Sequence, residues 1–338
     1  MENTNVKSKV FGRGAIQNVA SDVGTFVVCT MEIPWKLTKE LIGATPLAVV
    51  MVNSMEESVV ESQLATVPEC DAFIGIGGGQ AVDLAKYLAW KRGKRLVTIP
   101  TVLSVDAFVT PSAGIRRGSE VVYVGETSPD PLVIDYDIIR TAPLELNVAG
   151  VGDLLSIHTA TFDWEYAQRQ SRSEYPFSAD AIAKARAILT NVMSKPQDIA
   201  RVTDDGIDTI VNGYMEVNSI CIPAGHYRVE EGSEHYLFYA MEKKYQHSFI
   251  HGHIVGLGVY IMSRLQQNKW EEITRFMDTV GLHYRPEHME LTKEGVKEVL
   301  RNLKAFVSSR SELWFTIIND TEFSEEVVER VTKGLFNC

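Results

Sequence analysis

Apolar residues in the first 145 positions gather in short runs, separated by stretches in which they recur with helical spacing. The runs that predict β-strands are 26–30, 46–52, 71–77, 95–100, 121–125 and 131–136. Their length and their content of Val, Ile and Phe are typical of strands. The stretches that predict helices run from about 34 to 42, from 55 to 67 and from 80 to 93. Strands that alternate with helices indicate a parallel sheet with helices on both faces.

The character of the chain changes after Pro143. From Asn147 to the C-terminus, apolar residues recur at helical spacing and strand-like runs are nearly absent. We therefore expect a Rossmann-like α/β nucleotide-binding domain over residues 1–145 and an all-helical domain over residues 146–338. In such an arrangement, the commonest place for a ligand is the cleft between the domains.

Composition and charge narrow the classes of function. The 338-residue chain carries a formal charge of −11, which disfavours nucleic acid as a partner because phosphate backbones need a basic face. The N-terminus lacks the apolar run of a signal peptide, and no apolar stretch approaches the roughly 18 residues of a membrane helix. The four cysteines show no C-x-x-C spacing, which predicts reduced thiols. We expect a cytoplasmic protein that does not bind membranes.

A glycine turn is the first candidate for chemistry. Gly77, Gly78 and Gly79 leave a predicted strand and enter a predicted helix. Backbone N–H groups at a helix N-terminus attract phosphate, and glycine lets the chain approach a pyrophosphate closely. The turn does not follow the usual G-x-G-x-x-G pattern, so a tight turn without a ligand remains the alternative.

Several fragments together resemble one superfamily. They are GIGGGQAVDLAK, IPTVLSVDAF, AGVGDLL, GSEH and HGHIVG. The sequence is similar to the dehydroquinate-synthase-like superfamily, which includes the iron-containing alcohol dehydrogenases. The resemblance extends over most of the chain and implies an α/β nucleotide-binding domain followed by an all-α domain.

The resemblance implies NAD or NADP as a cofactor. The residues that would contact it are Gly77, Gly78, Gly79, Asp83, Thr101, Ser104, Ser112 and Tyr123. Asp106 would approach the substrate hydroxyls and is a candidate for proton transfer. Without the resemblance, Asp83 and Lys86 would be a pair on the helix surface. The residues after 101 would be a polar loop at the carboxyl end of a strand, where α/β sheets commonly bind ligands.

The resemblance also implies a metal site. Asp153, His235 and His251, each expected near the start of a helix, would hold one divalent metal. Such a set suits Zn²⁺ or Fe²⁺ and leaves positions open for a substrate oxygen; of the two ions we expect Zn²⁺. Taken singly, each histidine would be an ordinary polar residue. His253 is a rival to His251, as a ligand or in contact with substrate.

The branch of the superfamily that the chain resembles most is that of glycerol-1-phosphate dehydrogenase. Arg228, seven residues before His235, is a candidate to grip a substrate phosphate; a surface arginine at a helix end is the alternative. The expected activity is an NAD(P)-linked, metal-dependent oxidoreductase that interconverts a small polyol or polyol phosphate and its ketone. Alternatives are a glycerol or other small-polyol dehydrogenase, a dehydroquinate-synthase-like cyclase (a lyase) and a nucleotide-binding relative without activity. We expect a homo-oligomer.

Overall fold

The computed structural model describes residues 3–118 and 120–336. The chain divides into two compact units between Asn147 and Val148, within helix α5 (Leu144–Ala149). The boundary predicted near residue 145 falls in the same helix. The two units are described separately.

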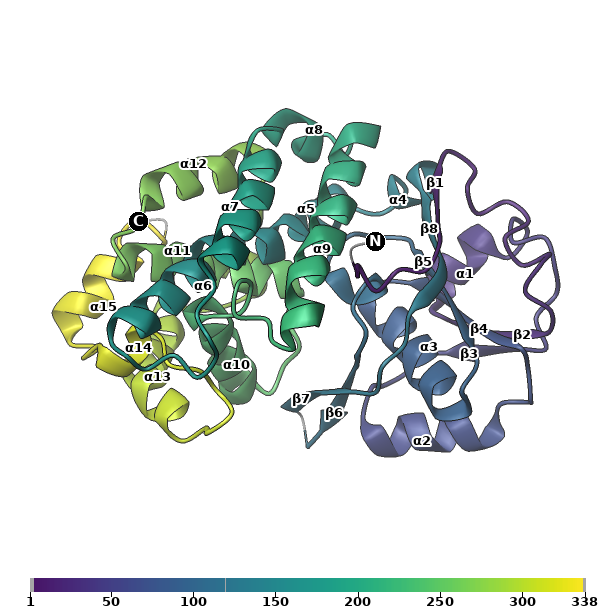
Figure 1. The fold of residues 1–338 in the computed structure, drawn as a ribbon, viewed down its shortest axis with the longest axis horizontal. Helices are drawn as coiled ribbons and strands as arrows, with labels where there is room; N and C mark the ends of the chain where they lie inside the picture. Colours follow the sequence, from purple (N-terminus) through teal and green to yellow (C-terminus); the bar gives the residue numbers. More distant parts are fainter. Residues whose placement is uncertain (1–2, 119, 337–338) are drawn as a thin grey trace. The chain divides into compact units, whose positions relative to one another are not determined.

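The first unit contains a six-stranded sheet in which all neighbouring strands are parallel. The order across the sheet is β1 (Lys9–Gly12), β8 (Pro129–Asp135), β5 (Arg95–Pro100), β4 (Ala72–Gly77), β2 (Phe26–Thr30) and β3 (Ala48–Met51) (Figure 1). The hydrophobic pattern did not predict β1. This strand lies at the sheet edge and none of its residues is fully buried, so it leaves no alternating pattern in the sequence.

Helices cover both faces of this sheet, as predicted. On β4, Phe73 packs toward one face, and Ile74 and Ile76 pack with the core of the other face. The first face is covered by α2 (Glu57–Thr66) and α3 (Gly79–Arg92), and the second by α1 (Glu32–Thr38) and α4 (Tyr136–Ile139). The completely buried strands explain why the sequence shows continuous apolar runs.

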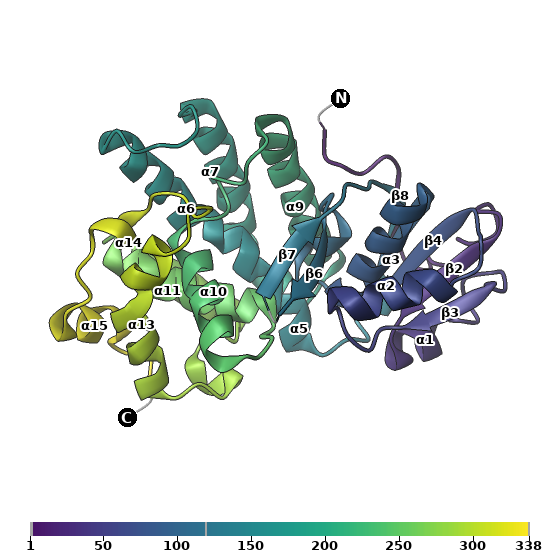
Figure 2. The ribbon, with the colours of Figure 1, turned by 90° about the horizontal axis from the view of Figure 1, so that it is seen from below.

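The apolar run at 121–125 is a strand, as predicted, but it does not join the parallel sheet, so the expectation that it belongs there is wrong. It forms β7 (Glu120–Val124), which pairs antiparallel with β6 (Ala113–Arg117) in a hairpin. Figure 2 shows this hairpin beside α2 and α3. Ala113 and Ile115 pack into the core beneath those helices, so the apolar positions of the hairpin face helices and not the sheet.

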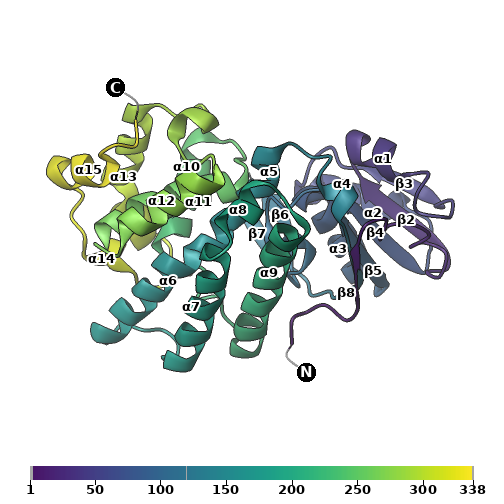
Figure 3. The ribbon, with the colours of Figure 1, turned by 90° about the horizontal axis from the view of Figure 1, so that it is seen from above.

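The second unit is helical in its described residues. Its helices are α6 (Val151–Arg169), α7 (Ala179–Met193), α8 (Pro196–Ala200), α9 (Asp204–Ala224), α10 (Ser233–Tyr245), α11 (His251–Leu265), α12 (Trp270–Val280), α13 (Lys293–Ser308), α14 (Ile317–Asp320) and α15 (Glu325–Thr332), with the 3₁₀ turn η2 (Pro286–Met289). Figure 3 shows α6, α7 and α9 side by side, and α12 packs against both α8 and α11. Among the described residues, no helix is long and apolar enough to cross a membrane.

Glycines set the distances between three of these helices. A Cβ at Gly152 of α6 would lie 2.0 Å from the carbonyl oxygen of Gly252 in α11. A Cβ at Gly252 would lie 1.7 Å from the carbonyl oxygen of Ala149. Further along α11, a Cβ at Gly258 would lie 2.5 Å from the carbonyl oxygen of Glu234 in α10. The backbones of α6, α10 and α11 therefore meet in direct contact, which only glycine permits.

Gly252→Ala is expected to lower the free energy of unfolding by about 3 kcal/mol, because its methyl group must push two backbones apart. Urea denaturation followed by the helical circular dichroism signal measures the effect. The matched control is Gly213→Ala in α9, where the new Cβ meets side-chain carbons rather than backbone, with Leu154 at 3.1 Å and Ile188 at 3.7 Å. A Gly252→Ala variant as stable as the control would contradict the close packing described here.

Candidate metal centre

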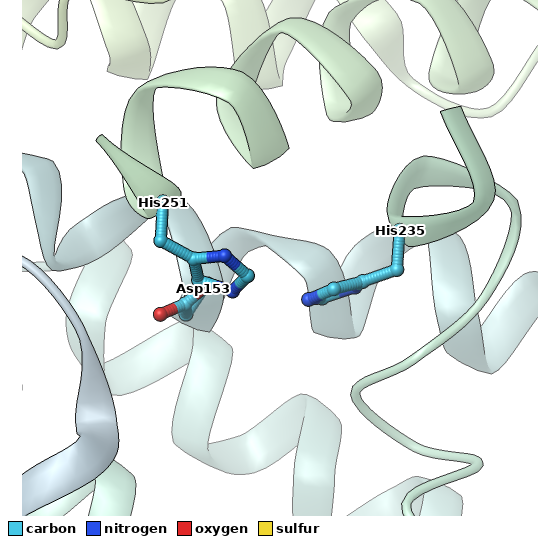
Figure 4. A group of neighbouring side chains, drawn as sticks. All are labelled: Asp153, His235 and His251. Atoms are coloured by element: carbon cyan, nitrogen blue, oxygen red, sulfur yellow. The ribbon is translucent and has the colours of Figure 1, made fainter. Parts of the chain in front are cut away.

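Three side chains from three helices converge in the second unit. Asp153 is the third residue of α6, His235 the third of α10 and His251 the first of α11. Their nitrogen and oxygen donor atoms lie within 4.8 Å of one another, and Figure 4 shows the side chains directed into a common space. Within residues 3–118 and 120–336, this is the one group of His, Cys, Asp or Glu that meets this spacing.

The carboxylate of Asp153 fits a cation. Both of its oxygens are buried, and neither accepts a hydrogen bond. Nε2 of His251 lies 3.0 Å from Oδ1 of Asp153. A buried carboxylate without hydrogen-bond donors is costly unless a positive charge compensates it. An imidazolium or a divalent metal bound between Asp153 and the two histidines would provide that charge.

The orientation of His235 leaves one ring nitrogen available. Its Nδ1 donates a hydrogen bond to Oε1 of Glu234 at 3.0 Å, since an ionised carboxylate can only accept. Burial alone would lower the pKa of His235. The hydrogen bond to Glu234 and the charges of Glu234, Glu231 and Asp153 outweigh burial and raise the pKa to about 9. The surroundings of His235 thus favour a positive charge, whether a proton or a metal ion.

Two acidic residues of this centre were not among the predicted site residues. Glu234 is the hydrogen-bond partner of His235. Burial, together with the charges of Glu234 and Asp153, raises the pKa of Glu231, while His235 and His251 lower it. Both glutamates belong to the acidic stretch VEEGSEH just before and around His235. This clustering of acidic residues beside a candidate metal ligand is the sequence signal that could have identified the two glutamates.

Other histidines lie outside the cluster. His253 is buried, with its ring centroid 5.4 Å from that of His283. Nε2 of His158 lies 2.6 Å from the carbonyl oxygen of Asn268. His253 is not part of the group whose donor atoms converge, so its predicted contact with substrate remains a prediction.

Arg228 is fully buried, so the alternative of a surface arginine is wrong. Its Nη2 donates a hydrogen bond to the carbonyl oxygen of Phe315 at 3.0 Å and lies 3.8 Å from Oε2 of Glu174. The guanidinium stands 5.5 Å from the ring centroid of Trp314, while Nε and Nη1 have no hydrogen-bond partner. A phosphate could reach this group only if the covering residues moved. Its role in gripping phosphate remains a prediction.

At the glycine turn, the backbone lies close to the neighbouring loop that follows β5. Gly77 ends β4 with φ +146°, Gly78 precedes α3 and Gly79 is the first residue of that helix. A Cβ at Gly79 would lie 2.8 Å from Cγ1 of Val105. The N–H of Thr101, just after β5, donates to the carbonyl oxygen of Gly77 at 3.1 Å. The turn and the loop from residue 101 therefore lie side by side at the carboxyl ends of two strands.

The remaining predicted residues of the first unit lie around this loop. Ser104 lies in the loop and Asp106 begins the 3₁₀ turn η1 (Asp106–Phe108). Ser112 immediately precedes β6, and Tyr123 lies on β7 with 55% of its surface exposed. Their contacts with a cofactor or substrate remain predictions.

Asp83 and Lys86 form a largely buried ion pair, with Nζ 2.8 Å from Oδ1. Lys86 is fully enclosed and also donates to the carbonyl oxygen of Ala107 at 2.8 Å and to Oγ1 of Thr110 at 3.2 Å. Burial raises the pKa of Asp83, and Lys86 lowers it. The alternative of a pair on the helix surface is therefore wrong. The pair ties α3 to the segment around η1.

Comparison with known proteins identifies the family. Residues 13–143 match the family described as iron-containing alcohol dehydrogenase. The glycerol-1-phosphate dehydrogenase (NAD(P)+) of Staphylothermus marinus is 31% identical over 262 residues, which cover 77% of this chain and 72% of that protein. The chain belongs to the iron-containing alcohol dehydrogenase family.

Two further proteins are similar to this chain in sequence or in fold. The glycerol-1-phosphate dehydrogenase (NAD(P)+) of Aeropyrum pernix is 27% identical over 288 residues, which cover 85% of this chain and 80% of that protein. The crystal structure of glycerol dehydrogenase from Schizosaccharomyces pombe superposes with a TM-score of 0.74 at 19% identity, covering 97% of this chain and 88% of that one. The predicted fold class, an α/β domain followed by a helical domain, is confirmed.

A metal-binding measurement tests whether His251 or His253 is the metal ligand. We expect the protein, stripped with a chelator and reloaded, to bind about one Zn²⁺. His251→Ala is expected to weaken binding at least about 100-fold, because it removes one of three ligands, whereas His253→Ala should change it only a few-fold. Competition with a chromophoric chelator measures both. Equal losses in the two variants would contradict the assignment.

Lys86→Met is expected to lower the free energy of unfolding by about 3 kcal/mol, because it leaves Asp83 charged without its partner. The control is Lys184→Met, whose ion pair with Asp180 is exposed and should change stability by less than about 0.5 kcal/mol. Urea denaturation measures both variants. Wild-type stability with a loss of NADH affinity in Lys86→Met would instead assign the pair to the cofactor.

Proposed function

We propose that this chain is a metal-dependent, NAD(P)-linked oxidoreductase that interconverts sn-glycerol 1-phosphate and dihydroxyacetone phosphate. The observation that carries the proposal is the convergence of Asp153, His235 and His251 from three helices in a member of the iron-containing alcohol dehydrogenase family. The similarity to the glycerol-1-phosphate dehydrogenases of Staphylothermus marinus and Aeropyrum pernix supports the choice of substrate.

Three residues would hold the metal in this proposal. Asp153 would contribute a carboxylate oxygen, His235 its Nε2 and His251 a ring nitrogen. A divalent metal at such a site supplies Lewis-acid polarisation of a substrate oxygen. Two imidazoles and one carboxylate suit Zn²⁺, which is the ion we propose, although the same set also accepts Fe²⁺.

The nucleotide would bind through the first unit. The turn at Gly77, Gly78 and Gly79 brings N–H groups at the start of α3 to a pyrophosphate, and the nicotinamide supplies the hydride chemistry. The neighbouring residues that would line the cofactor are Thr101, Ser104, Ser112 and Tyr123. Asp106 would approach the substrate hydroxyls. Either NAD or NADP is compatible with this arrangement.

A specific observation favours a second candidate, the oxidation of glycerol or another uncharged polyol. Arg228 is completely buried, and the charge of Glu231 acts on both His235 and His251. A carboxylate whose charge acts on the ligand histidines opposes a phosphorylated substrate by repulsion between like charges. The cyclase alternative has less support, because the relatives named above are dehydrogenases. We further propose that the enzyme acts as a cytoplasmic homo-oligomer.

The deciding experiment is oxidation of NADH and NADPH with dihydroxyacetone phosphate and with dihydroxyacetone, using protein reloaded with Zn²⁺ or Fe²⁺. We expect metal-dependent turnover of the phosphate ester, reduced about 1000-fold or more by His235→Ala, since metal polarisation lowers the barrier by several kcal/mol. The absorbance of the reduced nicotinamide reports turnover.

Arg228→Ala separates the two substrates. If Arg228 contacts the phosphate, the variant loses kcat/KM for the ester but not for dihydroxyacetone; a purely structural role lowers both equally. Turnover of dihydroxyacetone alone by the wild type would establish the polyol alternative. No nicotinamide oxidation with either compound would refute a dehydrogenase acting on these substrates.

A further inference from the structure

Glu234 occupies the junction of the three helices that carry the metal-centre side chains. It is the second residue of α10, immediately before His235, and is completely buried. A Cβ at Gly258 of α11 would lie 2.5 Å from the carbonyl oxygen of Glu234, so the backbones of α10 and α11 are in direct contact at this point. The side chain of Glu234 reaches Thr159 on α6.

Both carboxylate oxygens of Glu234 accept hydrogen bonds. Oε1 accepts from the N–H of Gly232 at 2.6 Å and from Nδ1 of His235 at 3.0 Å. Oε2 accepts from the hydroxyl of Thr159 on α6 at 2.7 Å. Thr159 is on the helix that carries Asp153. One carboxylate therefore links the start of α10, the ring of His235 and the helix of Asp153.

These contacts constrain His235 in two respects. A neutral imidazole carries one proton, on either nitrogen, and the acceptor at Nδ1 keeps the proton there. The lone pair is then on Nε2. The bond also fixes the rotation of the ring, because Glu234 is itself held by Thr159 and Gly232. Partners of this kind orient metal-binding histidines and increase their basicity.

We propose that Glu234 is the positioning residue of the metal centre. Its carboxylate holds His235 so that Nε2 faces Asp153 and His251, and it fixes α10 against α6 through Thr159. Glu234 does not itself belong to the group of converging donor atoms. The proposal rests on the metal centre of the proposed function.

The test is Glu234→Gln. Glutamine keeps the size of the side chain and one acceptor oxygen for Gly232 and His235, and its amide can donate to the Thr159 hydroxyl. We expect the fold to persist and the dissociation constant for Zn²⁺, measured against a chromophoric chelator, to rise about 10- to 100-fold. The visible absorption of the Co²⁺-loaded protein should also change, because it reports the ligand geometry.

Two further variants isolate the effect. Glu242→Gln removes a buried carboxylate from the same helix, two turns further on, and should leave the Zn²⁺ dissociation constant within about twofold. Thr159→Val removes only the hydroxyl that anchors Oε2, and we expect a smaller loss than in Glu234→Gln. If Glu234→Gln does not fold, Thr159→Val still tests the proposal.

The outcomes separate this proposal from the proposed function. Wild-type Zn²⁺ affinity and an unchanged Co²⁺ spectrum in Glu234→Gln would overturn the positioning role while leaving the metal centre intact. Equal losses in Glu234→Gln and Glu242→Gln, with a matching loss of helical signal, would reduce Glu234 to a structural residue. Wild-type protein that binds neither Zn²⁺ nor Co²⁺ would refute the metal centre itself, and the positioning role with it.

Discussion

The backbone contact between α6 and α11 is the constraint on which the candidate metal centre depends. Gly152 and Gly252 meet so closely that neither position has room for a Cβ. Asp153 follows one of these glycines, and His251 precedes the other. The separation of the two side chains is thus set by main-chain packing, which is far stiffer than a side-chain rotamer. Gly258 brings α10, and with it His235, to the same junction.

The charges of the two units suit opposite kinds of ligand. In the second unit, Asp153, Glu231 and Glu234 surround two histidines, and this negative field favours a cation. In the first unit, the glycine turn places the positive end of the α3 dipole at the carboxyl edge of a parallel sheet, which favours an anion. A dehydrogenase that uses a divalent metal and a dinucleotide needs both environments, and each is built by one unit.

Buried polar side chains near the metal centre also hold the segment from Trp314 to Ile317. The N–H of Trp314 donates to the hydroxyl of Tyr236, the residue after His235. Asp163 of α6 accepts from the N–H of Ile317 at 3.0 Å and from the N–H of Ser233 at 2.9 Å. Burial, and then the charge of Glu234, raises the pKa of Asp163 to about 6. Because these hydrogen bonds involve the N–H groups of Trp314 and Ile317, they constrain the backbone of the segment more than its side chains.

The sequence by itself determined the elements with a local signature. The buried runs of β2 and β4, the glycine turn before α3 and the helices that begin near Asp153, His235 and His251 all follow from neighbouring residues. Only the tertiary structure decided the edge strand β1, the β6–β7 hairpin and the burial of Arg228 and Lys86. The partner of β1 is more than a hundred residues away in β8, and Arg228 bonds to Phe315, 87 residues further along. No local pattern records such pairs, because the free energy that selects them comes from burial and hydrogen bonding between distant segments.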